Sequence, residues 1–370
     1  MIQRLRSLFL GLSVLPADFV RQNGFRTVIL PVALSDASDA SSGLRQAIFA
    51  ISAYHLWGHD AAVKYKLSAI MHLSKSLQNG EDAALSQFAT SMMLCIGDVF
   101  DSADGSWPKH LAAAKALGNQ LSKNGDYSKS LLFLQTLLEY HDVLKGFSLG
   151  RHLASDSEFT CTLEAIKLPE ENSDNTVIIG SLGCSRELMN LLALITRLHK
   201  LIPLPHHLQA IPILIRTRLE ELTQIPILIP DAHSGQLDIT CILQTAELYR
   251  LASIIYLHTT SLPLARSSAQ FQSLVSRVLG LLETLSVCTS PWPLFVTALE
   301  VDNDADRVRI LRVLETMQKI RRIGNVDVLQ SVVVAVWKLM DLRGGNCGDD
   351  DERLDWRELF DISGHLPSFI

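Results

Sequence analysis

The sequence predicts an all-α protein, built as a layered helical array with no substantial sheet. Composition is the first observation: 48% of the 370 residues are apolar and only 19% are charged, which supplies a large core and excludes a wholly disordered chain. Aromatic residues make up only 6%, while leucine, isoleucine, valine and alanine dominate, and this mix favours helices over a β-sandwich. The third observation is that apolar residues recur at helical spacing along most of the chain.

Two segments carry complete helix signals. Between Ser185 and Leu201 the apolar residues recur at i, i+3, i+4, i+7 and i+10, and the Ser185 hydroxyl can accept an early N–H. The segment Asp304–Ile323 has acids in its first turn and cations in its last, where the helix dipole favours each. We expect Gly324 to end that helix as a left-handed cap.

Eight further segments show the same period. They are Leu44–Trp57, Ala62–Leu77, Ala83–Phe100, Lys109–Leu121, Ser130–Leu144, Cys241–His258, Ser267–Leu285 and Val326–Met340.

One of these segments determines the kind of helical array. The helix predicted at Cys241–His258 is apolar nearly all round, so it must be covered on most sides, which requires more than one layer of helices. The short apolar runs Ile211–Ile215 and Ile225–Ile229 lie near prolines, and their length does not distinguish helix from strand.

Charge and cysteine spacing argue against a DNA-binding module. The formal net charge is −6, whereas a domain built to bind phosphates is usually basic. The six cysteines never lie closer than 23 positions apart, so clustered thiolate zinc ligands are absent from the sequence. In a long apolar chain we interpret these thiols as small core residues rather than a disulfide framework.

The sequence contains no recognised catalytic or nucleotide-binding signature. We therefore predict no catalytic, cofactor-binding or metal-binding residue and no cofactor. His55 and His59 are spaced to share one helical face, but Asp60 is the only acid beside them, so we interpret them as surface or interface residues. The adjacent side chains of His206 and His207 diverge on a helix.

The acidic run Asp349–Glu352 has two readings. Carboxylates of this kind hold Mg²⁺ and a diphosphate in terpene cyclases, but no second ligand motif accompanies them, so we favour a solvated loop. The longer stretch Asp349–Phe360 could be an acidic activation segment. We favour instead a C-terminal helix that docks on the core through Leu354, Trp356 and Leu359.

Five stretches together carry a family likeness over about Asn23 to Trp356. They are Asn23–Arg26 with Leu30–Leu34 and Leu44–Leu56; Trp107–Leu111 with Ala113 and Ala114; Gly183–Leu188; Ala246–Ala252 with Tyr256 and Leu257; and Pro291–Phe295 with Gly324–Val326, Val336, Trp337, Asp355 and Trp356.

In their order and spacing these stretches resemble the fungal-specific transcription factor domain, the regulatory region of the zinc binuclear cluster regulators, and most nearly its acriflavine-sensitivity branch. The resemblance implies an all-α fold and a regulatory role, with no universal ligand residues. Trp107, Trp292 and Trp337 are interpreted as packing residues, and Tyr249 and Arg250 as needing hydrogen-bond partners. The family's six-cysteine cluster, which holds two zinc ions and reads DNA, is missing here.

The extent of the likeness also sets the expected domain organisation. Length alone allows one large domain or two ordinary ones. Because the resemblance covers nearly the whole chain, we predict a weakly ordered segment over 1–22 and a single helical regulatory domain over 23–370. Within it, the region at about 150–183 has no sustained period and is predicted as a variable surface excursion.

The resulting hypothesis is a nuclear, otherwise cytoplasmic, transcription regulator or co-regulator that lacks its own DNA-binding domain. Its partners would be proteins, either a DNA-binding homologue or a second copy, with a small-molecule effector and a link to a biosynthetic gene cluster. No direct nucleic-acid or membrane binding is expected. One alternative is a small-molecule-binding protein or a cyclase or isomerase, although the sequence favours a non-enzyme. Another is a zinc cluster encoded upstream of Met1.

Overall fold

The structure is a computed structural model of the whole chain. It describes residues 24–80, 83–101, 105–123, 128–150, 168, 173–180, 182–226, 239–285, 288, 291–321, 324–344, 355–359 and 367–369.

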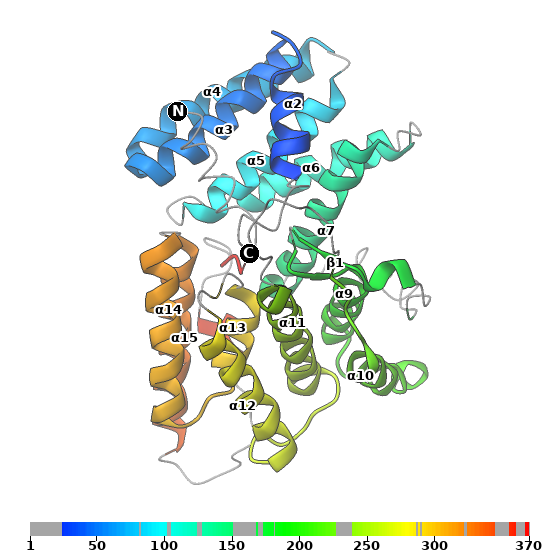
Figure 1. Cartoon of the computed structure of the whole chain (residues 1–370), viewed down its shortest axis with the longest axis vertical. Coiled ribbons are helices and arrows are strands. Elements are labelled where there is room, and N and C mark those ends of the chain that lie inside the picture. The colour runs from blue at the N-terminus through cyan, green and yellow to red at the C-terminus, as the bar shows by residue number, and fades with distance from the viewer. Residues whose placement is uncertain are drawn as a thin grey trace. The chain divides into compact units, whose positions relative to one another are not determined.

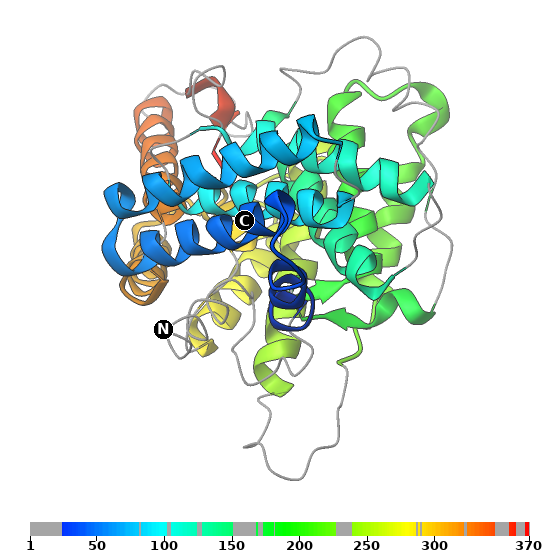
Figure 2. The same cartoon turned by 90° about the horizontal axis from the view of Figure 1, so that it is seen from above.

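Helices dominate these described residues and confirm the predicted all-α class (Figures 1 and 2). The α-helices that the described residues form are thirteen: α2 (Leu30–Ala33), α3 (Asp39–Trp57), α4 (His59–Gln78), α5 (Ala84–Phe100), α6 (Trp107–Lys123), α7 (Lys129–Leu149), α9 (Arg186–Lys200), α10 (Ile211–Glu221), α11 (Ile239–Thr260), α12 (Ala269–Thr284), α13 (Pro291–Ala298), α14 (Asp304–Arg321) and α15 (Gly324–Gly344). Shorter turns of helix are η2 (Phe25–Ile29), η3 (Ser173–Thr176), η4 (His206–Leu208) and η5 (Trp356–Leu359).

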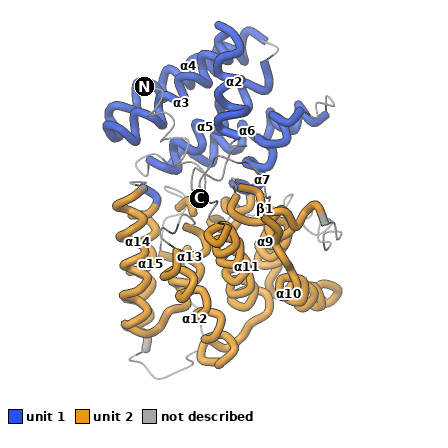
Figure 3. Tube along the Cα trace, in the orientation of Figure 1, with its two compact units in different colours: residues 1–142, 322–325 blue, residues 143–321, 326–370 orange. Residues whose placement is uncertain are grey.

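The chain divides into two compact units (Figure 3). The first comprises residues 1–142 with 322–325, and the second comprises residues 143–321 with 326–370. The boundary after residue 142 falls inside α7. A single domain over 23–370 stays a prediction.

The first unit is built around α5. Ser38 caps α3 by accepting the Ser41 N–H at 3.2 Å, and Gly58, at a φ of 87°, ends α3 and turns the chain into α4. The helices α3 and α4 therefore lie side by side (Figure 1). Because α3, α4 and α6 all pack on α5, every residue from Gln87 to Ile96 is buried.

The second unit is built around α11. The helices α9, α10, α12 and α13 all contact it, and most of its residues from Cys241 to His258 are buried. This confirms the prediction that a helix apolar on nearly every side must be covered by more than one layer. The helices α14 and α15 form a pair (Figure 1), joined by two hydrogen bonds from Arg307 to Asp341, of 2.9 and 2.7 Å.

The sheet in the described residues is very small, as the sequence predicts. Strands β1 (Ile178–Ile179) and β2 (Cys184–Ser185) pair antiparallel, with Ile178 opposite Ser185 and Ile179 opposite Cys184. An isolated parallel bridge joins Val177 to Ile225.

Two local expectations are settled by the structure. The run Ile211–Ile215 is helical, because it begins α10 with Pro212 in the first turn, where a missing N–H costs nothing. The prediction of a left-handed cap at Gly324 is wrong, because this glycine is the first residue of α15. Its place after one amphipathic helix resembles a C-terminal cap, but it starts the next helix instead.

Several predictions fall on residues that the structure leaves undescribed. The N-terminal segment 1–22, residues 227–229 and the acidic run at 349–352 lie outside the described residues. So does most of the predicted excursion at about 150–183. Within it, the described residues Ile178 and Leu182 are buried.

Candidate functional site

An aromatic cluster forms the centre of the second unit. Phe147, near the C-terminal end of α7, contacts Tyr256 of α11, Trp292 of α13, Trp356 of η5 and Phe369, with ring centroids 5.1–6.0 Å apart. Most of these pairs are edge-to-face, the arrangement in which the positive edge of one ring meets the negative face of another. Side chains from four separate stretches of sequence therefore meet at one ring.

Arg357 lies buried beside this cluster and binds the end of α7. Its Nε donates to the carbonyl oxygens of Phe147 and Ser148 at 3.2 Å each, and its guanidinium stacks 4.6 Å from the centroid of the Trp356 ring. The last carbonyls of a helix have no partner within the helix and attract cations. Arg357 therefore acts as a cap for α7.

Gly150 makes room for this cap. It follows α7 with a φ of 54°, and its N–H donates to the Gly146 carbonyl at 3.1 Å. A Cβ atom at Gly150 would come within 2.5–2.9 Å of the Arg357 side chain. A glycine is thus required at this position both for the backbone conformation and for the approach of Arg357.

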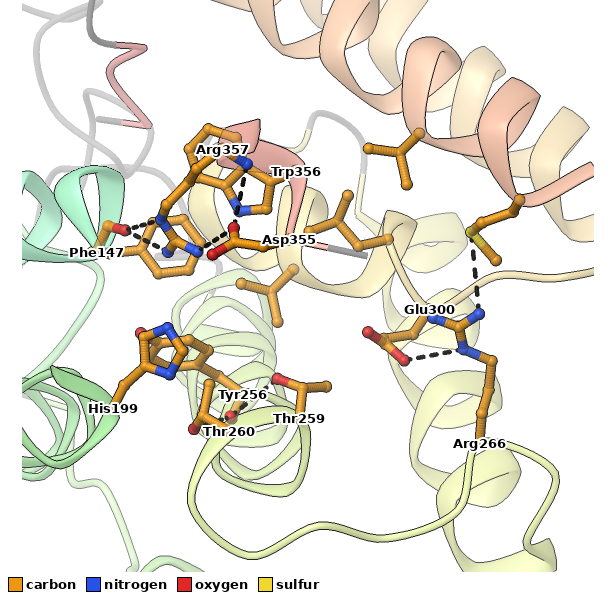
Figure 4. A pocket seen from close by; sticks show the side chains of 14 residues that line it. Phe147, His199, Tyr256, Thr259, Thr260, Arg266, Glu300, Asp355, Trp356 and Arg357 are labelled. Carbon is orange, nitrogen blue, oxygen red and sulfur yellow. Dashed lines mark hydrogen bonds and ion pairs between the residues drawn. The ribbon is translucent and has the colours of Figure 1, made fainter. Parts of the chain in front are cut away.

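A cavity of about 140 Å³ lies next to the cap within the second unit (Figure 4). Its lining comes from α7, α9, α11, α13, α15 and η5, and from the segments that follow α13 and precede α12 and η5. The lining residues are Phe147, His199, Tyr256, Thr259, Thr260, Arg266, Val296, Leu299, Glu300, Val336, Met340, Asp355, Trp356 and Arg357.

Two acid–base pairs lie in this lining, together with the ring of His199, whose charge also lowers the pKa of Asp355. Arg357 Nη1 donates to Asp355 Oδ1 at 2.9 Å, and Arg266 Nε donates to Glu300 Oε2 at 3.2 Å (Figure 4). Burial would raise the pKa of Asp355, but the charge and hydrogen bonds of Arg357 outweigh it and hold that pKa below its usual value. Asp355 is therefore ionised at neutral pH, and each carboxylate compensates one arginine.

Tyr256 brings a different group to the cavity. Its side chain is buried, and its hydroxyl has no hydrogen-bond partner of normal geometry among the described residues, although Thr196 and Arg357 lie near it. Burial raises the pKa of this phenol despite the nearby charge of Arg357, so the phenol keeps its proton at neutral pH. The hydroxyls of Thr259 and Thr260 both donate to the Tyr256 carbonyl, at 3.0 and 2.7 Å.

The tryptophans singled out in the sequence are buried, which confirms their interpretation as packing residues. Trp107 begins α6, Trp292 stacks on Tyr249 with centroids 6.0 Å apart, and Trp337 donates to the Ala298 carbonyl at 2.8 Å. Arg250 finds the partners that its buried helix requires. It donates to the Leu219 carbonyl at 2.7 Å and to the Glu247 carboxylate, also at 2.7 Å through Nε.

The stretch Gly183–Leu188 also has a structural role. The Ser185 hydroxyl accepts the Leu188 N–H at 3.3 Å and caps α9, as predicted. The Ser185 N–H donates to the Gln224 side chain at 2.8 Å, and Gln224 in turn donates to the Ala246 carbonyl at 2.7 Å. One glutamine thus links the start of α9 to α11.

His55 and His59 do not share a helix, because Gly58 ends α3 between them. His59 Nδ1 lies 2.5 Å from Asp101 Oδ2, and this carboxylate raises the pKa of His59. No group of three or more metal-ligating side chains occurs among the described residues. His206 and His207 are exposed in η4.

The described part of the C-terminal region docks as predicted, with one difference. Trp356 is buried, and Leu359 is half-buried, but the element is the short 3₁₀ turn η5 rather than a full helix. Leu354 lies outside the described residues. No pattern in the sequence marks Arg357, Gly150 or Tyr256 as residues of this site. A glycine after an apolar run is a signal for a helix C-terminus, but nothing in the sequence connects it to an arginine some 200 positions later.

Four of the six cysteines can be placed. Cys95, Cys184, Cys241 and Cys288 are buried and form no disulfide among the described residues, which confirms their interpretation as core residues, and burial raises the pKa of Cys184. Cys161 and Cys347 lie outside the described residues. No helix in the described part of the chain is long and apolar enough to cross a bilayer.

Comparison with known proteins identifies the family. Residues 6–370 match the family described as fungal specific transcription factor domain. The transcription factor iacI of Pestalotiopsis fici is 23% identical over 337 residues, which cover 86% of this chain and 82% of that protein. No solved structure matches the chain. The chain therefore belongs to the fungal specific transcription factor domain family and is a transcription regulator.

Proposed function

We propose that this chain regulates transcription in the nucleus through protein partners, and that these partners, rather than the chain itself, bind DNA. The observation that carries the proposal is the match of residues 6–370 to a regulatory family, in a sequence whose six cysteines are too far apart to form a zinc cluster. The partner would be a DNA-binding homologue or a second copy of the chain that is held by one.

The proposal includes a response to a small metabolite and control of biosynthetic genes. The cavity beside Arg357 supports the first part, because it brings paired charges, a phenol and aromatic rings together inside the helical unit. The similarity to the transcription factor iacI supports the control of biosynthetic genes through the regulatory role that the two proteins share.

We do not advance a cyclase or isomerase function. The cavity of about 140 Å³ is smaller than the roughly 300–1,000 Å³ of pockets that enclose drug-sized ligands. The acidic run that suggested a diphosphate site lies outside the described residues.

A tethering assay tests the regulatory role. The full chain is fused to a heterologous DNA-binding domain and placed upstream of a reporter, and deletion of the gene is followed by transcript sequencing. We expect the fusion to change reporter output severalfold and the deletion to change the transcripts of a defined gene set that includes biosynthetic enzymes. Unchanged output together with unchanged transcripts would show that the chain is not a regulator.

A DNA-binding assay tests whether the chain needs a partner to bind DNA. We expect the purified chain to bind duplex promoter DNA no more tightly than a scrambled duplex at physiological salt, because no basic reading element is present in the sequence. Tight and sequence-selective binding by the chain alone would refute this part of the proposal. A fluorescent fusion that stays out of the nucleus would refute the localisation.

A further inference from the structure

We infer that the cavity beside Arg357 binds a small uncharged ring compound that carries an oxygen acceptor, such as an aromatic ketone or a phenol. The inference names the ligand class of the effector in the proposed function, and its regulatory meaning rests on that proposal. Four properties of the cavity support it: the volume, the charge balance, the buried Tyr256 hydroxyl and the aromatic wall.

Volume limits the ligand to about one ring. The cavity measures about 140 Å³, close to the ~150 Å³ of an engineered apolar cavity that takes up benzene. A single six-membered ring with one short substituent is therefore the largest rigid body that fits without movement of the walls.

Charge balance argues against an ion. The Asp355 carboxylate is paired with Arg357 at 2.9 Å, and the Glu300 carboxylate is paired with Arg266 at 3.2 Å. Arg357 is also bound to the carbonyls at the end of α7. An anion would have to compete with these carboxylates for the arginines, and a cation would have to compete with the arginines for the carboxylates.

The Tyr256 hydroxyl supplies the specific contact. Tyr256 is 4% exposed, and its hydroxyl is the one phenolic donor of the lining that is buried without a hydrogen-bond partner among the described residues. A buried donor left unpaired is costly, so a ligand oxygen that accepts from it gains more than the same contact would in water.

The aromatic wall favours a flat ring. Phe147, Tyr256 and Trp356 all line the cavity, and Phe147 packs edge-to-face on Tyr256 with centroids 5.1 Å apart (Figure 4). A further planar ring can extend this arrangement. Saturated chains of equal volume would lose these ring contacts.

Three probes of similar size test the inference on the purified full chain. Acetophenone has a ring and an acceptor, ethylbenzene has the ring alone, and benzoate has the ring with a charge. Calorimetry and ligand-observed NMR should show saturable acetophenone binding, with ethylbenzene and benzoate weaker by about three- to tenfold or more, the worth of one hydrogen bond. The absence of saturable acetophenone binding, or tighter binding of benzoate, would overturn the inference.

Two variants locate the binding. Tyr256→Phe removes the donor and keeps the ring, so it should weaken acetophenone about three- to tenfold and leave ethylbenzene unchanged. Thr259→Leu fills the cavity and should weaken both probes. Its matched control is Thr316→Leu on the exposed face of α14, where the threonine also donates to a carbonyl of its own helix, that of Arg312 at 2.8 Å.

The two proposals can fail separately. If Tyr256→Phe binds acetophenone with unchanged affinity, Tyr256 is not the donor. If Thr259→Leu binds acetophenone with unchanged affinity, the binding site lies elsewhere. Both results would leave the regulatory role intact. Acetophenone binding in a chain that never alters the reporter would contradict the proposed function and leave the binding site standing.

Discussion

Among single residues, Gly150 has the sharpest steric constraint. Its φ of 54° favours glycine, and a Cβ there would meet the Arg357 side chain at 2.5–2.9 Å. We expect Gly150→Ala to lower the free energy of unfolding by about 1–3 kcal/mol, from backbone strain together with displacement of Arg357. Urea denaturation followed by circular dichroism measures the loss.

The matched control for Gly150 is Gly280, in the interior of α12. A Cβ at Gly280 would meet no heavy atom within 4 Å, and the residue has ordinary helical geometry. Gly280→Ala should therefore stabilise the protein by about 0.5–1 kcal/mol. Equal effects of the two substitutions would contradict the role given to Gly150.

His141 predicts a pH dependence of stability. It is buried in α7 with Nδ1 2.7 Å from the Leu137 carbonyl, and burial lowers its pKa from 6.5 to about 4. The unfolded chain therefore binds a proton between pH 6.5 and 4 that the native chain does not, so stability is lost as pH falls. From pH 7.5 to 5 this loss should be about 2 kcal/mol.

The measurement compares His141→Leu with the wild-type chain by urea denaturation across that pH range. Subtraction of the two curves cancels the groups that are common to both. We expect the variant to lose about 2 kcal/mol less than the wild type on acidification. Parallel curves would show that His141 is already protonated in the native state.

At the scale of elements, the C-terminal turn η5 depends on one side chain. Removal of Arg357 would take away its 2.9 Å hydrogen bond to Asp355 and its hydrogen bonds to the Phe147 and Ser148 carbonyls at the end of α7. We expect Arg357→Ala to destabilise the second unit by about 3 kcal/mol and to speed hydrogen exchange in η5 and the last turn of α7. The exposed neighbour Glu358 is the control, and Glu358→Ala should leave both measurements unchanged.

Helices could be predicted from the sequence because their signals are local. Ser185 caps α9 and the acids of α14 lie in its first turn, and each signal spans only a few residues. The candidate site could not be predicted, because Phe147, Tyr256, Glu300 and Arg357 meet only after the second unit has folded. No periodicity links them. Gly324 was misassigned because a glycine between two helices fits the end of one and the start of the other.

At the scale of the whole molecule, we expect the two units to unfold together. Their boundary lies inside α7. The melting of that helix therefore removes Leu134 from the core of the first unit and Phe147 from the core of the second. We expect one calorimetric transition with equal van't Hoff and calorimetric enthalpies, and equal protection from exchange in α5 and α11. Two separated transitions would refute the single domain predicted over 23–370.

The bond between Arg357 and Phe147 also has a consequence for synthesis. More than two hundred residues separate its ends, so most of the second unit leaves the ribosome before the end of α7 can be capped. The aromatic cluster stays open until Trp356 and Phe369 arrive. Translation at about 5–20 residues per second makes that wait roughly ten seconds or longer, during which exposed rings are available to chaperones. A stop codon before residue 356 would make this open state permanent.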